Sequence, residues 1–245
     1  TVSAVPDIDG LLASATAPAH IQQAPNRFAV GTLAKAMAES RSEDGCREDG
    51  PGLSILPGVP PTVRGSALHR VLELWNLSEP LPPLIDRVVR ECCDSMEVAA
   101  LLRPYMLDRA EAFRETPLGK RLAAEKNIRY EQPFQLRLEG GVIAGAIDVL
   151  LSDGTVIDYK TGRHASWKHE RYAWQVRLYA LAYRRLVGQV VPAAHLYYLD
   201  TGEHHEVDVS APMLETTEQR AREVFRRLRD DGAFRVRIHA DADPN

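Results

Sequence analysis

A central stretch of the sequence places charged residues where buried strands are expected. Two apolar runs, residues 142–151 and 155–159, flank Ser-Asp-Gly-Thr and therefore predict a β-hairpin. Asp148 lies in the first run, Asp158 lies in the second, and Lys160 follows directly. Because a buried charge is costly without a partner charge, these two strands need a compensating group, and a divalent metal is the simplest one.

The register of this hairpin decides whether the charged groups meet. Side chains alternate faces along a strand, so Asp158 and Lys160 point the same way. A two-residue Asp-Gly loop would pair Asp148 with Tyr159 and would put the two carboxylates on opposite faces. A three-residue loop, or a bulge at Gly154, shifts the register so that Asp148 faces Lys160 and all three groups converge. We predict this shifted register.

Composition narrows the class of protein. The chain has 245 residues, of which 44% are hydrophobic and 26% charged, which is typical of a soluble globular protein. The formal net charge of −4 means that a DNA partner would have to be held by a local patch or by metal. Three cysteines, two of them adjacent, suit neither a disulfide framework nor a four-cysteine metal site. No run approaches the roughly 20 apolar residues of a membrane span, so we expect a cytoplasmic protein without a membrane partner.

The expected elements run from helices to a block of strands and then alternate. Helices are predicted over 28–38, 64–77, 82–102, 104–115, 117–126, 166–187 and 213–229, and strands over 128–138, 142–151, 155–159, 194–199 and 205–209. This order predicts an α/β fold with a central mixed β-sheet flanked by helices and an N-terminal helical region. We assign residues 1–61 to a linker with a short helix, 62–235 to one domain, and 236–245 to a tail. The start at threonine is compatible with a fragment of a longer chain.

Four further residues are candidates for the same site. His69 lies on the helix over 64–77, and Gly65 one turn earlier lets a backbone or ligand approach that face. Glu131 lies on the strand before the hairpin, and Gln175 and Tyr179 share a face of the helix over 166–187. Each has an ordinary alternative: a surface or capping histidine, an edge-strand carboxylate, and a solvated helix face.

Considered together, these features form an ordered set of motifs. In chain order they are Gly65-x-x-x-His69, Glu131-x-Pro-Phe134, Gly145-x-Ile-Asp148, Asp158-Tyr-Lys160-Thr-Gly and Gln175-x-x-x-Tyr179. The set resembles the RecB-like nuclease family of the PD-(D/E)XK superfamily, the nuclease module at the C-terminal end of RecB and AddA helicase–nucleases. The resemblance covers roughly residues 64–185 and implies a PD-(D/E)XK nuclease core.

The resemblance also implies a metal centre. Asp148 and Asp158 would bind the metal as carboxylates, with His69 and the backbone carbonyl of Tyr159 as further ligands. Glu131 would bind directly or through water and would share the catalytic role of the two aspartates. Oxygen ligands with one imidazole suit Mg²⁺, with Mn²⁺ as the alternative. The four cysteines with which some relatives hold an iron–sulfur cluster are absent, so we expect no cluster.

The remaining implied roles concern the substrate. Lys160 would orient the attacking water or stabilise the charged transition state, and Gln175 and Tyr179 would support the site or contact the DNA backbone. The last helix carries several arginines that either track phosphates or form a solvated face. These arginines are Arg220, Arg222, Arg226, Arg227 and Arg229.

The resemblance therefore favours a Mg²⁺-dependent deoxyribonuclease of exonuclease type. It would act on single-stranded or frayed DNA in end processing and recombinational repair, at the nucleoid of a bacterial-type cytoplasm. A helicase motor would lie in the same full-length chain or in a partner subunit. The alternative is a catalytically silent module of this fold that binds DNA or a helicase partner. Because Asp148, Asp158 and Lys160 are all present, the sequence favours activity. Nothing specific supports a hydrolase of another phosphate ester.

Overall fold

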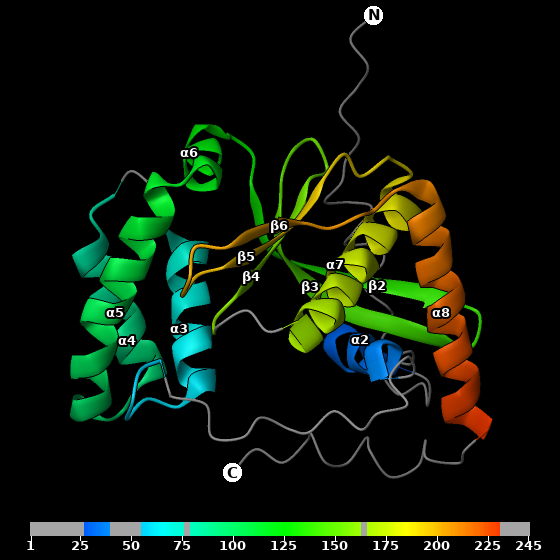
Figure 1. Ribbon diagram of the computed structural model, residues 1–245. Coiled ribbons are helices and arrows are strands. Elements are labelled where there is room, and N and C mark those ends of the chain that lie inside the picture. The colour runs from blue at the N-terminus through cyan, green and yellow to red at the C-terminus, as the bar shows by residue number, and fades with distance from the viewer. Residues whose placement is uncertain (1–26, 40–54, 76–78, 163–165, 231–245) are drawn as a thin grey trace, which may run out of the picture.

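The computed structural model describes residues 27–39, 55–75, 79–162 and 166–230, and it shows a six-stranded mixed sheet with helices on both sides (Figure 1). The strands are β1 (Arg27–Ala29), β2 (Arg129–Leu138), β3 (Gly141–Leu150), β4 (Val156–Lys160), β5 (Ala194–Tyr198) and β6 (His204–Glu206). The helices are α2 (Val30–Glu39), α3 (Pro61–Leu74), α4 (Leu81–Cys92), α5 (Met96–Glu115), α6 (Pro117–Ala124), α7 (Ser166–Val187) and α8 (Ala211–Asp230). The predicted α/β architecture is confirmed.

The sheet is organised around β3. The antiparallel strand β2 pairs with one edge of β3 along its whole length. The other edge is shared, because β1 pairs in parallel with residues 142–144 and β4 pairs with Val149 and Leu150. Beyond β4, the strand β5 runs parallel and β6 antiparallel. On the shared edge, residues 145–148 have no ladder partner in the described part of the chain, so the sheet opens beside Asp148.

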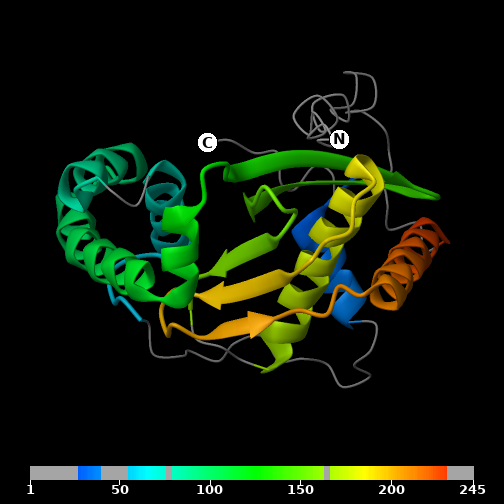
Figure 2. The same cartoon turned by 90° about the horizontal axis from the view of Figure 1, so that it is seen from above.

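Two hydrophobic cores cover the two faces of the sheet. Helices α2, α7 and α8 pack on one face, with strand residues such as Ile143, Ile147 and Leu196. The helices α3 to α6 form a separate group on the other face, with Val149 and Ile157 among their strand partners, and Figure 2 shows this group at one end of the sheet. Along β3, Ile147 packs in the first core, whereas Val149 packs in the second. Asp148 lies between them, where the strand passes from one core to the other.

The segment over residues 27–39 belongs to this sheet. The helix predicted at 28–38 is observed as α2, and Leu33 and Met37 are fully buried between the sheet and α7 and α8. The strand β1 before it was not predicted. Residues 27–39 therefore pack against the rest of the fold and do not form an extended linker. The domain boundaries at 62 and 236 stay predictions, and residues 1–26, 40–54 and 231–245 lie outside the described residues.

The break between α4 and α5 was predicted at residue 103, and this prediction was wrong. The chain leaves the helix at Cys93 and starts α5 after Ser95, whose hydroxyl accepts a hydrogen bond from the Val98 amide as an N-cap. Pro104 lies inside α5, where it removes one backbone hydrogen bond. The neighbours Leu102 and Met106 are fully buried, and this burial offsets the cost of the proline.

Within the described ranges, no helix is both long and apolar enough to cross a membrane.

Candidate metal centre and active site

The turn between β3 and β4 contains three residues, 152–154. The Leu151 amide donates to the Thr155 carbonyl at 3.0 Å, and the Gly154 amide donates to the Leu151 carbonyl at 3.0 Å. Gly154 has a φ of 89°, which glycine adopts without steric cost. A Cβ at this position would also lie 2.8 Å from the ring of Tyr183. The three-residue turn was one of the two alternatives that we predicted for a shifted register.

The register itself differs from the prediction. Val149 pairs with Ile157, so the position opposite Asp148 belongs to Asp158 and not to Lys160. The predicted partner was wrong by two residues, because a turn closed at residues 151 and 155 moves the register in the other direction. The two carboxylates still lie close together, because the charge of Asp148 helps to raise the pKa of Asp158. Both charges also raise the pKa of Tyr179, so the carboxylates lie near α7.

Glu131 extends this row of carboxylates onto β2. Its neighbours Tyr130 and Gln132 pair with the residues on either side of Asp148, so Glu131 lies level with Asp148 across the strands. Among the described residues other than glycine, only Glu131 has a positive φ, at 47°. Such a backbone conformation is costly for a side chain with a Cβ, and strained residues of this kind cluster at active sites and ligand-binding sites.

The helix α3 brings His69 to the row. The ring Nδ1 lies 3.6 Å from Asp148 Oδ2, and His69, Glu131 and Asp148 offer ligand atoms that all lie within 4.8 Å of one another. Burial lowers the pKa of His69 to about 4, helped by the charge of Lys160, although a hydrogen bond with the backbone of Tyr159 opposes this. The imidazole is therefore neutral near pH 7, and the neutral form is the one that binds metals.

Asp148 is held in place by the backbone of the adjacent strand. Its Oδ2 accepts a hydrogen bond from the Tyr159 amide at 2.9 Å, at the point where the β3–β4 ladder has ended. Burial raises the pKa of Asp148 to about 6, even though Lys160 lowers it. The same strand segment offers the Tyr159 carbonyl near His69. Asp148 and the Tyr159 carbonyl, which are two of the predicted metal ligands, are therefore linked through the backbone of Tyr159.

Asp158 is the most deeply buried charge of the site. Its side chain is 0% exposed, and Lys160 Nζ lies 2.6 Å from Oδ2. The other oxygen, Oδ1, has no hydrogen-bond partner in the described structure. Burial raises the pKa of Asp158 to about 7, against the opposing effect of Lys160. Burial alone would lower the pKa of Lys160, but the carboxylates of Asp158 and Asp148 outweigh it and raise that pKa.

These groups fit a divalent cation. The site offers three carboxylates and one neutral imidazole, and one of the buried carboxylate oxygens has no hydrogen bond. A cation at this place would satisfy the unpaired oxygen and offset the cost of two buried charges. The site opens into a groove of about 560 Å³ whose lining includes Gly65, His69, Glu131 and Thr161.

Gln175 and Tyr179 lie on the side of α7 that faces the carboxylates. Gln175 Nε2 donates a hydrogen bond to the Tyr179 hydroxyl at 2.7 Å. Burial raises the pKa of Tyr179 well above its usual value, and the charges of Asp158 and Asp148 add to this effect. The roles predicted for the site residues stay predictions, but the structure brings all of these side chains to one region.

Sequence reasoning missed Tyr172. Lys160 Nζ lies 4.9 Å from the centre of the Tyr172 ring, so the ammonium is held between an aromatic face and a carboxylate. Tyr172, Gln175 and Tyr179 have the i, i+3, i+7 spacing of one helical face, and this pattern could have identified Tyr172.

Fold and site together define an α/β protein with a carboxylate–lysine centre built on a hairpin. Residues 14–242 match the model of the PD-(D/E)XK nuclease superfamily, and the chain belongs to this superfamily. The resemblance inferred from the motifs is thereby confirmed. Membership of the superfamily supports a nuclease-type function.

Known relatives share only part of their length with this chain. It is 31% identical over 173 residues to an ATP-dependent helicase/nuclease subunit of Listeria monocytogenes serotype 4a (strain HCC23), a match that covers 57% of this chain and 14% of that protein. The helicase/nuclease subunit of the same name from Moorella thermoacetica is 31% identical over 177 residues, covering 61% of this chain and 12% of the relative. The chain thus spans a small fraction of the curated relatives that it matches.

A solved structure shares the fold. A crystal structure of a protein from Eubacterium rectale that is assigned as an exonuclease superposes with a TM-score of 0.54, covering 89% of this chain and 88% of that one. The sequence identity is 10%, so this likeness shows the fold alone.

Proposed function

We propose that this chain is a divalent-metal-dependent nuclease that hydrolyses phosphodiester bonds in DNA. One observation carries the proposal. Asp148 and Asp158 each adjoin the last pair of the β3–β4 ladder, Val149 with Ile157, and the ammonium of Lys160 lies 2.6 Å from Asp158. An aspartate, a second acidic residue and a lysine two residues later are the residues after which the superfamily is named.

The metal would be held by Asp148 and Asp158, with His69, the Tyr159 carbonyl and Glu131 completing the ligand set. When bound, a divalent cation lowers the pKa of water and neutralises charge that develops on phosphate oxygens. This mixture of oxygen ligands with one imidazole supports Mg²⁺, with Mn²⁺ as the alternative.

Lys160 supplies the second positive charge. The carboxylates around it keep its ammonium protonated, and Asp158 and the Tyr172 ring restrict its position. An ammonium fixed in this way donates hydrogen bonds to a phosphate oxygen or to the attacking water without having to reorganise during the reaction. The neutral His69 leaves Lys160 as the principal cation of the side-chain cluster.

The names of the relatives supply the biological setting of the proposal. They are ATP-dependent helicase/nuclease subunits, and this chain matches 14% or less of two of them. We therefore propose a role in processing single-stranded or frayed DNA ends during recombinational repair. A helicase motor would lie in the same full-length protein or in a partner subunit. Cleavage from DNA ends, as an exonuclease, belongs to the same proposal.

The test is cleavage of end-labelled single- and double-stranded DNA with Mg²⁺, with Mn²⁺ and with EDTA. Asp158→Asn should abolish cleavage. The matched control, Asp153→Asn, neutralises an exposed aspartate in the turn of the same hairpin, which pairs with Arg121, and it should leave cleavage unchanged. Cleavage that survives Asp158→Asn would contradict the proposal. If the wild-type chain binds Mn²⁺ but cleaves no DNA, the silent DNA-binding module becomes the better description.

A further inference from the structure

A buried carboxylate outside the metal centre connects three separate elements. Asp200 lies in the turn after β5, and its side chain is 3% exposed. The Tyr105 hydroxyl on α5 donates to Asp200 Oδ1 at 2.7 Å, and the backbone amide of Gly162 donates to Oδ2. On α3, Arg64 Nη2 lies 3.8 Å from the same Oδ2, and the Arg64 side chain is 6% exposed. We call these four residues the Asp200 hub.

The hub contacts α3 and the end of β4, and each of these elements carries part of the metal centre. Arg64 and His69 lie on α3, whereas Gly162 follows Lys160 at the end of β4. These elements are in close contact, because a Cβ added to Gly65 would lie 3.0 Å from the Thr161 hydroxyl.

The turn that carries Asp200 is hydrogen-bonded both to the end of β4 and to α5. The Leu199 amide donates to the Lys160 carbonyl at 2.8 Å, and Arg109 of α5 donates to the Asp200 carbonyl at 2.7 Å. The Asp200 carboxylate therefore has one fixed position from which it reaches both the end of β4 and α3.

We propose that Asp200 is a positioning residue that sets the distance between His69 on α3 and the carboxylates on the strands, and hence the affinity for a divalent cation. The inference rests on the proposed metal site and goes beyond it. His69 lies on α3 and Asp148 on β3, where its carboxylate accepts a hydrogen bond from the Tyr159 amide of β4. The 3.6 Å between the side chains of His69 and Asp148 therefore depends on how α3 sits against β3 and β4. Groups that orient ligands in this way change metal affinity without binding metal themselves.

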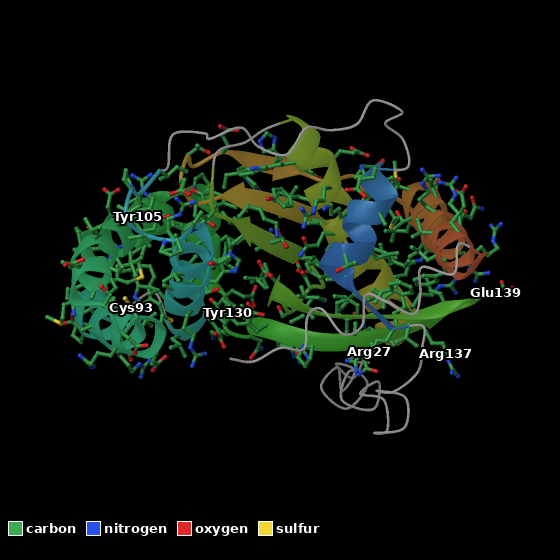
Figure 3. The ribbon with its side chains drawn as sticks, turned by 90° about the horizontal axis from the view of Figure 1, so that it is seen from below. Arg27, Cys93, Tyr105, Tyr130, Arg137 and Glu139 are labelled. Carbon is green, nitrogen blue, oxygen red and sulfur yellow. The ribbon has the colours of Figure 1, made fainter. Side chains whose placement is uncertain are left out.

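The polar character of the hub supports a role in geometry rather than in stability. Burying an Arg–Asp pair costs about as much in desolvation as it returns, so an apolar cluster at this place would stabilise the fold equally well. Directed bonds to Tyr105 and Gly162 fix a position, which apolar packing does less sharply. Figure 3 shows Tyr105 among the helices α3 to α5, at the opposite end of the molecule from Arg137 and Glu139.

The decisive variant is Tyr105→Phe, which deletes one hydroxyl and keeps the ring beside Arg64. Calorimetric titration of the metal-free chain with Mn²⁺ should show an affinity about tenfold weaker than wild type. The matched control is Tyr183→Phe, which deletes the hydroxyl that donates to Gln189 at 2.9 Å in a fully buried tyrosine of α7. The control should bind Mn²⁺ within about twofold of wild type, although it also loses one hydrogen bond.

A second variant, Asp200→Asn, keeps an acceptor oxygen but removes the charge that faces Arg64. It should weaken Mn²⁺ binding at least as much as Tyr105→Phe. Where cleavage is measured, both variants should need more metal for half-maximal rate and should recover much of the rate at saturating metal. That pattern separates a change in metal affinity from general loss of fold.

The inference is overturned if Tyr105→Phe lowers the melting temperature but binds Mn²⁺ as well as the Tyr183→Phe control. It is also overturned if the wild-type chain binds no Mn²⁺. If the wild type binds Mn²⁺ without cleaving DNA, the binding titrations still decide the role of Asp200, and only the proposed nuclease activity fails.

Discussion

The metal centre and the cluster around Glu218 both combine acidic and basic side chains, and their electrostatics are opposite. On α8, Glu218 accepts hydrogen bonds from Arg185 and Arg222, the latter at 2.7 Å. Burial raises the pKa of Glu218, but the two arginines outweigh it and the net shift is downward. In the metal centre, the pKa values of Asp148 and Asp158 rise to about 6 and 7 although Lys160 is adjacent.

The difference is one of charge balance. Glu218 has two cations, whereas Lys160 alone serves Asp158 and Asp148, with Glu131 close by. A cluster with matched charges stabilises the fold, while a cluster with an excess of buried carboxylate is costly until a cation arrives. The comparison also bears on the arginines of α8. Arg220 and Arg227 pair with Glu223, so the contacts favour an ion-paired, solvated face over a phosphate-tracking edge.

The largest expected effect separates Lys160, the cation of the metal centre, from the arginines that surround Glu218. Lys160→Met keeps the length of the side chain but removes its charge, so Mn²⁺ should still bind while cleavage at saturating metal falls by about 10² to 10³. Arg185→Met should leave the cleavage rate unchanged. Single-turnover rates and Mn²⁺ titrations on both variants check this. A Lys160→Met chain that cleaves at nearly the wild-type rate would show that the lysine has no part in the chemistry.

His69 should have a smaller effect, confined to metal affinity. His69→Ala removes one ligand but leaves the carboxylates, so the Mg²⁺ concentration for half-maximal cleavage should rise by about tenfold. His204→Ala, at an exposed position of the far strand β6, serves as the control. An unchanged Mg²⁺ titration would assign His69 to packing against Tyr159, with which its ring makes an edge contact.

The same comparison shows what the sequence could and could not predict. Strand alternation places Asp158 and Lys160 on one face, and this holds because it depends only on two residues that lie two positions apart on one strand. The register opposite Asp148 was wrong, because Ser-Asp-Gly-Thr is compatible with several turns and each turn shifts the partner. The Asp200 hub left no local signal, since Tyr105 and Asp200 are 95 residues apart. Contacts of that kind depend on how whole elements pack.

The pH dependence of stability should differ between the two clusters. Folding raises the pKa values of Asp148 and Asp158 to about 6 and 7, so their stabilising contribution is complete below the unfolded value of 3.8 and is lost as pH rises through 6 to 7. The metal-free chain should therefore lose stability between about pH 4 and pH 7. Asp148→Asn should reduce that loss by on the order of 2 kcal/mol. Urea unfolding in EDTA measures this, and Mn²⁺ should stabilise the wild type but not the variant.

The smallest effect concerns Glu218, whose lowered pKa gives the opposite sign. Its contribution is present above the unfolded value of 4.5 and is lost as pH falls through the lower folded value. Glu218→Gln should destabilise the chain by about 1 kcal/mol near neutral pH, and the difference should shrink in acid. Glu215→Gln, at an exposed position of the same helix, should change stability by only a few tenths of a kcal/mol. Mn²⁺ affinity should be the same in both variants. A weaker affinity in Glu218→Gln alone would mean that the two clusters are coupled through α7, which carries Arg185 as well as Gln175 and Tyr179.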